Sequence, residues 1–181
     1  MSVEQEPERR EQEGDAVDAD TAQLVREAQR GDEFAMARLL AVLAPYVGRL
    51  CAPIALSDGE DATQEALIAV FRGLRSVRDP QAVYGWVRVI AVREAIRVVR
   101  RHGREAPAEL ADLPAPGDIH ATVHVRDVLE RLSPEHRAIL VLREVEGLDE
   151  RSAARLLGIS LGTAKSRLHR ARARFKEAWS A

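Results

Sequence analysis

Apolar residues recur along most of the chain at spacings of three and four, which is the period of an amphipathic helix. Between residues 32 and 50, for example, Leu39, Leu43, Val47 and Leu50 form one such stripe. No segment shows the strict alternation of a half-buried strand, and none carries the turn residues of a β-hairpin. The pattern therefore predicts an all-α protein.

Breaks between the apolar stripes divide the first half of the chain into four helices. Gly31 ends the first helix, and the turn Ser57-Asp58-Gly59 precedes the third, which runs to Leu74. The first, second and fourth helices are predicted at residues 21–30, 32–50 and 81–101.

Four further helices are predicted in the second half, beginning with one at residues 123–132. Ser133 suits the N-cap of the next helix and Pro134 its first position, and Gly147 is expected to end it. Only Gly158-Ile159-Ser160 separates the last two helices, 149–157 and 161–179. Such a short glycine-containing turn predicts a helix-turn-helix, whose second helix enters the major groove of DNA.

Composition divides the chain into four parts. Residues 1–19 contain almost no large apolar side chains, which predicts a disordered acidic tail. Residues 103–120 hold several prolines and glycines, which predicts a flexible linker. Residues 20–102 and 121–181 are expected to form two small helical domains, the second containing the helix-turn-helix.

The formal net charge of −2 conceals a strong segregation of charge. Residues 1–20 hold eight acids and two arginines, residues 72–104 hold nine arginines and two acids, and residues 151–181 hold eight bases and one acid. Basic blocks of this kind are typical of a protein that binds a polyanion, although a solvated helix face gives the same pattern.

The chain has a single cysteine, Cys51, so it cannot form an intramolecular disulfide or a cysteine cluster for a metal. No metal or cofactor is expected. We expect no apolar run that approaches the ~20 residues of a membrane span, and the acidic N-terminus does not resemble a secretory signal. A soluble, cytoplasmic protein is predicted.

The last predicted helix combines an apolar stripe with a polar face that suits DNA binding. The stripe consists of Leu161, Ala164, Leu168, Ala171, Phe175 and Trp179. In the first turns, Thr163, Ser166, Arg167 and Arg170 are candidates for base edges or nearby phosphates. Further phosphate attraction is expected from Lys165, Arg172, Arg174 and Lys176. An ordinary surface helix with a basic face remains the alternative.

Two sets of residues carry more than helical periodicity. One set lies in the second half, at 132–137, 142–148 and 157–172, and the other lies upstream, at 61–66 and 71–74, followed by Trp86. The first set closely resembles the C-terminal domain of the extracytoplasmic function (ECF) sigma factors. The second resembles the polymerase-binding helix of the same family, and Trp86 stands where the family keeps a tryptophan. The resemblance covers nearly everything except the predicted tail and linker.

The resemblance implies a transcription initiation factor and not an enzyme, with no catalytic residue. In this family the N-terminal domain docks on the largest subunit of core RNA polymerase and captures the melted −10 element of promoter DNA. The C-terminal domain sits on the second-largest subunit and reads the −35 element as duplex. Whether an anti-sigma protein also binds the chain stays open.

Site residues follow from the resemblance position by position. The implied polymerase contacts are Asp61, Gln64, Glu65 and Phe71. The implied −10 contacts are Arg78, Gln81, Tyr84, Arg93, Arg97, Arg100 and Arg101. The implied −35 contacts are Thr163, Lys165, Ser166, Arg167, Arg170 and Arg174. In the loop that would receive a flipped base, Tyr84 is the stacking candidate, whereas Trp86 is assigned to packing. Because Arg93 and Arg97 replace residues that are often Asn and Asp in the family, the family's −10 sequence preference does not carry over.

A stand-alone DNA-binding regulator and a helical hydrolase are the alternatives to a transcription initiation factor. A stand-alone regulator that binds an operator as a dimer would use the same helix-turn-helix, but it leaves the motif at residues 61–74 unexplained. A helical hydrolase would need a phosphate-cradling glycine loop, paired metal ligands or a nucleophile motif, and the sequence contains none of these.

Overall fold

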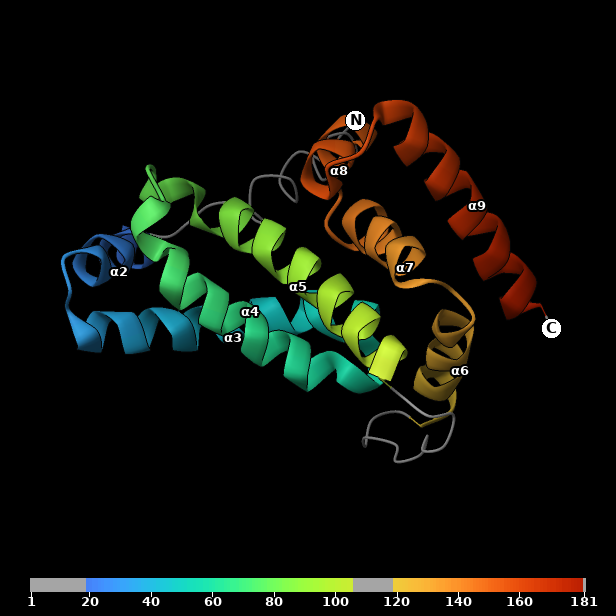
Figure 1. Ribbon diagram of the computed structural model, residues 1–181, viewed down its shortest axis with the longest axis horizontal. Helices are drawn as coiled ribbons and strands as arrows, with labels where there is room; N and C mark the ends of the chain where they lie inside the picture. Colours follow the sequence, from blue (N-terminus) through green and yellow to red (C-terminus); the bar gives the residue numbers. More distant parts are fainter. Residues whose placement is uncertain (1–18, 106–118, 181) are drawn as a thin grey trace, which may run out of the picture.

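The structure is a computed structural model that describes residues 19–105 and 119–180. Within these ranges every regular element is a helix, which confirms the all-α prediction (Figure 1). The N-terminal domain consists of α2 (Ala19–Gln29), α3 (Glu33–Ala55), α4 (Gly59–Gly73) and α5 (Val83–Glu105). The C-terminal domain consists of α6 (Ile119–Glu130), α7 (Pro134–Leu140), α8 (Glu150–Leu157) and α9 (Leu161–Trp179). The predicted tail, apart from Ala19, and most of the predicted linker lie outside the described residues.

Helix α3 forms the centre of the N-terminal domain and packs against α2, α4 and α5. Its predicted stripe is fully buried, as are Cys51 and Ile54 one turn later. The predicted end of this helix at Leu50 is therefore wrong, because the next apolar turn also belongs to the core and keeps the helix going to Ala55.

By length and composition, the segment Glu33–Ser76 contains a stretch apolar enough to cross a membrane, so our expectation that no such run exists is wrong. Core helices of globular proteins pass the same test, and several large side chains of α3 lie inside the domain. Leu39, Leu43 and Leu50 are each 0% exposed. We therefore treat α3 as a core helix.

A tight turn joins α3 to α4 at the predicted position. Leu56 leaves α3 with a φ of 54°, in the left-handed region that L-residues seldom adopt. A single 3-10 turn, Leu56–Asp58, then leads into α4. Gly59 is the first residue of α4, and a Cβ there would lie 3.2 Å from the Cα of Ala52, so the glycine favours the close approach of α4 to α3.

The predicted signals in the C-terminal domain lie at or next to helix ends. The hydroxyl of Ser133 accepts a hydrogen bond from the His136 amide at the start of α7, and Pro134 takes the first helical position. Helix α7 continues as a π-helical segment, Val141–Val145, and Gly147 follows with a φ of 65°. Gly158 ends α8 with a φ of 66°. The helix-turn-helix prediction is thus confirmed.

The two domains pack directly on each other. Helix α7 contacts α3 and α5 on one side and α9 on the other, so it lies between the N-terminal domain and the last helix (Figure 1). Its residue Ile139 belongs to the core beneath the helix-turn-helix, whereas Ala138 belongs to one apolar cluster with the N-terminal helices. The sequence did not predict this shared cluster.

Candidate nucleic-acid interface

The N-terminus of α9 is held rigidly by its cap and by its core. The Ser160 hydroxyl accepts a hydrogen bond from the Thr163 amide at 3.1 Å and lies 2.8 Å from the Thr163 hydroxyl. Behind it, Ala164, Leu168 and Ala171 are buried. The N-terminal end of a helix also carries a partial positive charge, which favours an anion such as a phosphate.

Five of the six predicted −35 residues lie exposed on the face of α9 opposite that core, namely Thr163, Lys165, Ser166, Arg170 and Arg174. The guanidinium of Arg170 folds back onto the helix and donates to the Ser166 carbonyl at 3.1 Å and to its hydroxyl at 3.2 Å. These hydrogen bonds lie within one exposed helix, so the guanidinium can exchange them for another acceptor at little cost.

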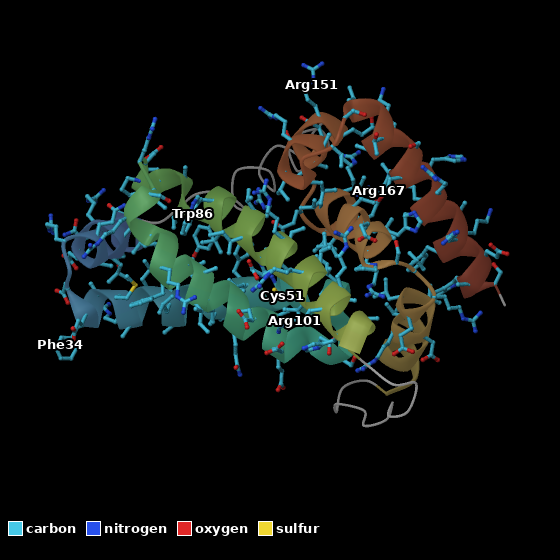
Figure 2. All side chains as sticks on the ribbon, in the orientation of Figure 1. Phe34, Cys51, Trp86, Arg101, Arg151 and Arg167 are labelled. Carbon is cyan, nitrogen blue, oxygen red and sulfur yellow. The ribbon has the colours of Figure 1, made fainter. Side chains whose placement is uncertain are left out.

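Other basic residues of α9 lie in different surroundings from those predicted. Arg167 is half-buried and lines a cleft toward α5 (Figure 2). Arg172, a predicted phosphate contact, is paired with Glu144 at 2.7 Å. Lys165 lies 3.8 Å from Glu150, a separation that leaves it free to turn toward DNA.

His136, on α7, lies close to the cations of this face of α9. Burial lowers the pKa of His136, and the nearby cations Arg174, Arg167 and Arg170 lower it further. Its Nδ1 atom is buried and has no hydrogen-bond partner among the described residues. The folded chain therefore holds His136 neutral over a pH range in which the unfolded chain is partly protonated.

The lowered pKa predicts that stability falls as the pH drops from 7 to 5. Above the ordinary histidine pKa of about 6.5 neither state binds this proton, and below it the unfolded state binds the proton first, so unfolding is favoured. Thermal unfolding of the wild-type chain at pH 7, 6 and 5 should show this loss, and His136→Gln should reduce it. His169→Gln, on the exposed face of α9, should keep the wild-type pH dependence; an unchanged slope in His136→Gln would contradict the assignment.

The predicted polymerase contacts on α4 fall into two groups. Gln64 and Phe71 are exposed, and Phe71 is 54% accessible. Asp61 and Glu65 instead face α5, where Asp61 pairs with Arg101 at 3.1 Å and Glu65 with Arg97 at 3.2 Å. Predicted polymerase contacts are thus paired with predicted DNA contacts, and charge reversal at either acid would disturb both.

One exposed residue of α4 was missed. Ile68 is 44% accessible and lies between Gln64 and Phe71 on the same face of the helix. Its spacing of four from Gln64 and three from Phe71 was the signal that would have found it. Together the three side chains form an exposed stripe with an apolar centre.

The predicted loop before α5 is anchored to the N-terminal domain. The side-chain amide of Gln29 donates to the carbonyls of Leu74 and Val77, at 3.0 and 2.7 Å. Arg78 and Gln81 are exposed at its surface. The loop is therefore held against α2, and the side chains of Arg78 and Gln81 are accessible to solvent.

The two aromatic residues after the loop have separate environments. Trp86 packs against α4, where a Cβ on Gly73 would lie 3.0 Å from its ring. Tyr84 is half-buried and meets the ring of Tyr46 edge to face, with the centroids 5.2 Å apart. The assignment of Trp86 to packing is confirmed, and part of the Tyr84 ring is already in contact with Tyr46.

The predicted arginines of α5 line the cleft that also contains Arg167. This cleft has a volume of about 520 Å³ and is lined by Arg93, Arg97, Arg100, Arg101 and Arg167, with Glu135 and three apolar side chains. Arg100 pairs with Glu135 of α7 at 2.6 Å, and Arg93 donates weakly to the Leu156 carbonyl at 3.4 Å. In the described ranges no group of three or more His, Cys, Asp or Glu side chains is placed to hold a metal ion.

Comparison with protein families gives two matches that together cover most of the described residues. The model described as Sigma-70 region 2 matches residues 37–105, and the model described as Sigma-70, region 4 matches residues 123–175. The boundary between the two matches coincides with the segment between α5 and α6.

Relatives in other bacteria match over both parts. The RNA polymerase sigma-H factor of Pseudomonas aeruginosa is 31% identical over 173 residues, which covers 83% of this chain and 89% of the relative. The ECF RNA polymerase sigma factor SigE of Mycolicibacterium smegmatis is 35% identical over 132 residues, covering 66% of this chain and 51% of the relative. The chain thus spans about half the length of SigE, and 62% of SigM of Mycobacterium tuberculosis.

Two solved structures share the fold. The sigma factor RpoE of Bartonella quintana, determined with the anti-sigma factor NepR, superimposes with a TM-score of 0.62 at 24% identity and covers 80% of this chain and 96% of its own. CnrH, determined with the cytosolic domain of CnrY, gives a TM-score of 0.59 at 21% identity, with 87% and 96% covered.

Proposed function

This chain belongs to the extracytoplasmic function group of the sigma-70 family, and on that basis we propose that it is a transcription initiation factor. It binds core RNA polymerase and directs the enzyme to promoters by reading their −35 and −10 elements. Residues 20–102 serve polymerase docking and −10 recognition, and residues 121–181 serve −35 recognition.

The observation that carries this proposal is the exposed face at the start of α9. A serine cap fixes the helix, a buried apolar stripe seats it on α7 and α8, and hydroxyl and guanidinium groups occupy the free face. Groups of these kinds donate to base edges in the major groove and to phosphates. Ser166 and Arg170 are the proposed readers of the −35 duplex, and Thr163, Lys165, Arg167 and Arg174 support them.

The N-terminal domain supplies the second contact with promoter DNA. Arg78 and Gln81 on the anchored loop and the arginines of α5 form a basic surface suited to a single strand, beside the ring of Tyr84. Arg93, Arg97, Arg100 and Arg101 are assigned to the backbone of the −10 element. Their ion pairs are largely exposed, so phosphates compete for them readily.

The exposed stripe on α4 is the proposed docking surface for polymerase. Interface hot spots combine a buried apolar anchor with a polar rim, and Phe71 with Ile68 provides such an anchor beside Gln64. Asp61 and Glu65 contribute at the edge of this surface through the pairs that they form with α5.

The proposal includes a cellular setting. The chain acts in the cytoplasm, where its polymerase partner is found, and it supplies specificity without catalysing a reaction itself. Because RpoE was determined with the anti-sigma factor NepR, an anti-sigma protein is a further proposed partner of this chain.

Reconstitution tests the function directly. The purified chain is mixed with bacterial core polymerase and genomic DNA from its source, and the transcript starts are sequenced. Starts that share sequence elements near −35 and −10 support the proposal. Specific binding to duplex DNA without polymerase, with no defined start, would instead favour the stand-alone regulator.

Replacement of Phe71 by alanine is expected to weaken binding to core polymerase about fivefold or more, because truncating an interface anchor costs over ~1 kcal/mol. Binding is measured by fluorescence anisotropy of the labelled chain titrated with core enzyme. Phe34→Ala is the matched control, since Phe34 is 86% exposed in the first turn of α3 and does not belong to the stripe on α4 (Figure 2). An equal loss in both variants would contradict the docking surface.

A further inference from the structure

A basic cleft lies between α5 and the C-terminal domain, where α5 packs beside α7 and α8 (Figure 1). Its volume of about 520 Å³ is within the range of small-molecule sites, roughly 300–1,000 Å³. One wall is a single face of α5, on which side chains recur at spacings of three and four, namely Arg93, Ile96, Arg97, Arg100 and Arg101. The other wall belongs to the C-terminal domain and consists of Glu135, Leu157, Ile159 and Arg167. Both domains therefore contribute to one cavity.

Three of the five arginines in this cleft are already paired with acids. The closest nitrogen–oxygen distances are 2.6, 2.6 and 3.1 Å for the pairs Arg97–Glu94, Arg100–Glu135 and Arg101–Asp61. These three guanidinium groups therefore have their charge compensated within the chain itself.

The other two arginines, Arg93 and Arg167, have no acidic partner within the described part of the chain. Arg93 donates weakly to the Leu156 carbonyl at 3.4 Å, and Arg167 is half-buried where it lines the cleft. Two positive charges, one from each domain, thus share a cavity without a carboxylate paired to either. Because like charges repel each other, an anion that binds both of them is favoured there.

Guanidinium groups recognise a phosphate with particular strength. The planar group presents parallel N–H donors that match two phosphate oxygens, and hydrogen bonds between ionised groups are stronger than neutral ones. A carboxylate fits the same donors, so the arginines alone do not distinguish a phosphate ligand from an acidic peptide.

The apolar lining of the cleft makes this distinction. Ile96, Leu157 and Ile159 are each half-buried, so each retains surface that a ligand can cover. An inorganic phosphate or an acidic peptide would leave this surface in contact with water. The flat faces of a nucleobase are largely apolar and would remove it from water. Arginines beside an apolar surface therefore fit a nucleotide.

We propose that the cleft is a binding site for a free nucleotide with two or more phosphate groups. The phosphates bind Arg93 and Arg167, and the base packs on the apolar lining. The inference goes beyond the proposed function, because it concerns the chain without polymerase or promoter. Since both arginines are also assigned to promoter DNA, the nucleotide and the promoter use them in turn.

Isothermal titration calorimetry of the full chain tests this site. The probes are guanosine diphosphate and adenosine diphosphate, with pyrophosphate as the matched anion that lacks a base and poly-glutamate as an acidic chain. At least one of the two nucleotides should saturate one site per chain. It should bind roughly tenfold or more tightly than pyrophosphate, because its base buries additional apolar surface.

Substitutions of the two unpaired arginines locate the site. Arg93→Ala and Arg167→Ala should each weaken nucleotide binding roughly tenfold or more, because each removes hydrogen bonds between ionised groups. Arg155→Ala is the matched control and should bind as the wild type does. Arg155 is exposed on α8, carries the same charge and hydrogen-bonds to Ser152 of its own helix, outside the lining of the cleft.

A third substitution tests the position of the base. Ile159→Ala should weaken binding of the nucleotide and leave binding of pyrophosphate unchanged, because only the nucleotide has a base to pack on this side chain. Arg93 is exposed, so Arg93→Ala leaves the core intact and stays informative even if Ile159→Ala disturbs the fold. Circular dichroism of each variant checks the helical content.

The contrary outcomes each remove a defined part of the inference. No saturable binding of either nucleotide would overturn the site. Pyrophosphate or poly-glutamate that binds as tightly as the nucleotides would overturn the nucleotide as its ligand. Equal losses in Arg155→Ala and Arg167→Ala would overturn its location. None of these results affects the proposed function, which fails separately if reconstituted transcription has no defined start.

Discussion

Replacement of Arg170 by alanine is expected to reduce transcription from the cognate promoter by roughly 5- to 150-fold, because a well-placed contact with a base is worth about 1–3 kcal/mol. The side chain lies on the exposed face of α9 and, within the part of the chain that the structure describes, hydrogen-bonds to Ser166 of the same helix. Its removal therefore takes nothing from the core of the domain. Binding to core polymerase should be unchanged.

The measurement is run-off transcription with reconstituted polymerase at fixed salt, since phosphate contacts weaken as salt rises. Arg151→Ala is the matched control, because Arg151 is exposed, projects outward from α8 and carries the same charge but is not one of the proposed DNA contacts (Figure 2). A loss confined to Arg170→Ala supports direct reading of the −35 element. A parallel loss of polymerase binding would count against it.

Replacement of Arg137 by methionine is expected to lower the free energy of unfolding by about 2–4 kcal/mol. Arg137 is 5% exposed and donates to the carbonyls of Ile54, Leu129 and Leu132, at 2.7, 3.2 and 2.8 Å. These carbonyls lie at the ends of α3 and α6, where backbone acceptors lack helical partners. Leaving each buried acceptor unpaired costs about 1–3 kcal/mol, partly offset because methionine has no charge to desolvate.

Urea unfolding followed by circular dichroism measures this loss. Arg137→Lys should give an intermediate value, since an ammonium keeps the charge but cannot reach three acceptors in the planar geometry of a guanidinium. Arg131→Met, at an exposed position six residues earlier, should have little effect. Equal stabilities for Arg137→Met and Arg131→Met would show that the three hydrogen bonds contribute nothing.

Local signals explain why the helices could be predicted. Ser133, Asp149 and Ser160 each cap a helix through a bond to the amide three residues later, and Gly158 adopts the left-handed conformation that ends α8. Such signals act within one turn of the chain, so adjacent residues suffice to recognise them. The end of α3 was missed because the burial of Ile54 depends on other helices.

The candidate sites were predictable only in part, for the same reason. The exposed face of α9 followed from helical periodicity, because a buried stripe determines which residues lie opposite it. The pairing of Asp61 with Arg101 and of Glu65 with Arg97 did not, because it depends on how α4 packs against α5. The predicted polymerase contacts on α4 and the predicted DNA contacts on α5 are therefore linked by ion pairs.

The sequence by itself determined the helical class, the caps, the helix-turn-helix and the family, because each of these is encoded within short stretches of chain. The tertiary structure alone decided that Glu146 reaches Arg88 and Tyr46, 58 and 100 residues away, and that Arg137 binds the end of α3. The residues next to a charged side chain in the sequence do not identify its ion-pair partner. The Coulomb and hydrogen-bond energies that favour one partner over another act at contact distances, and packing establishes those distances. The way in which the two domains meet is therefore a property of the fold.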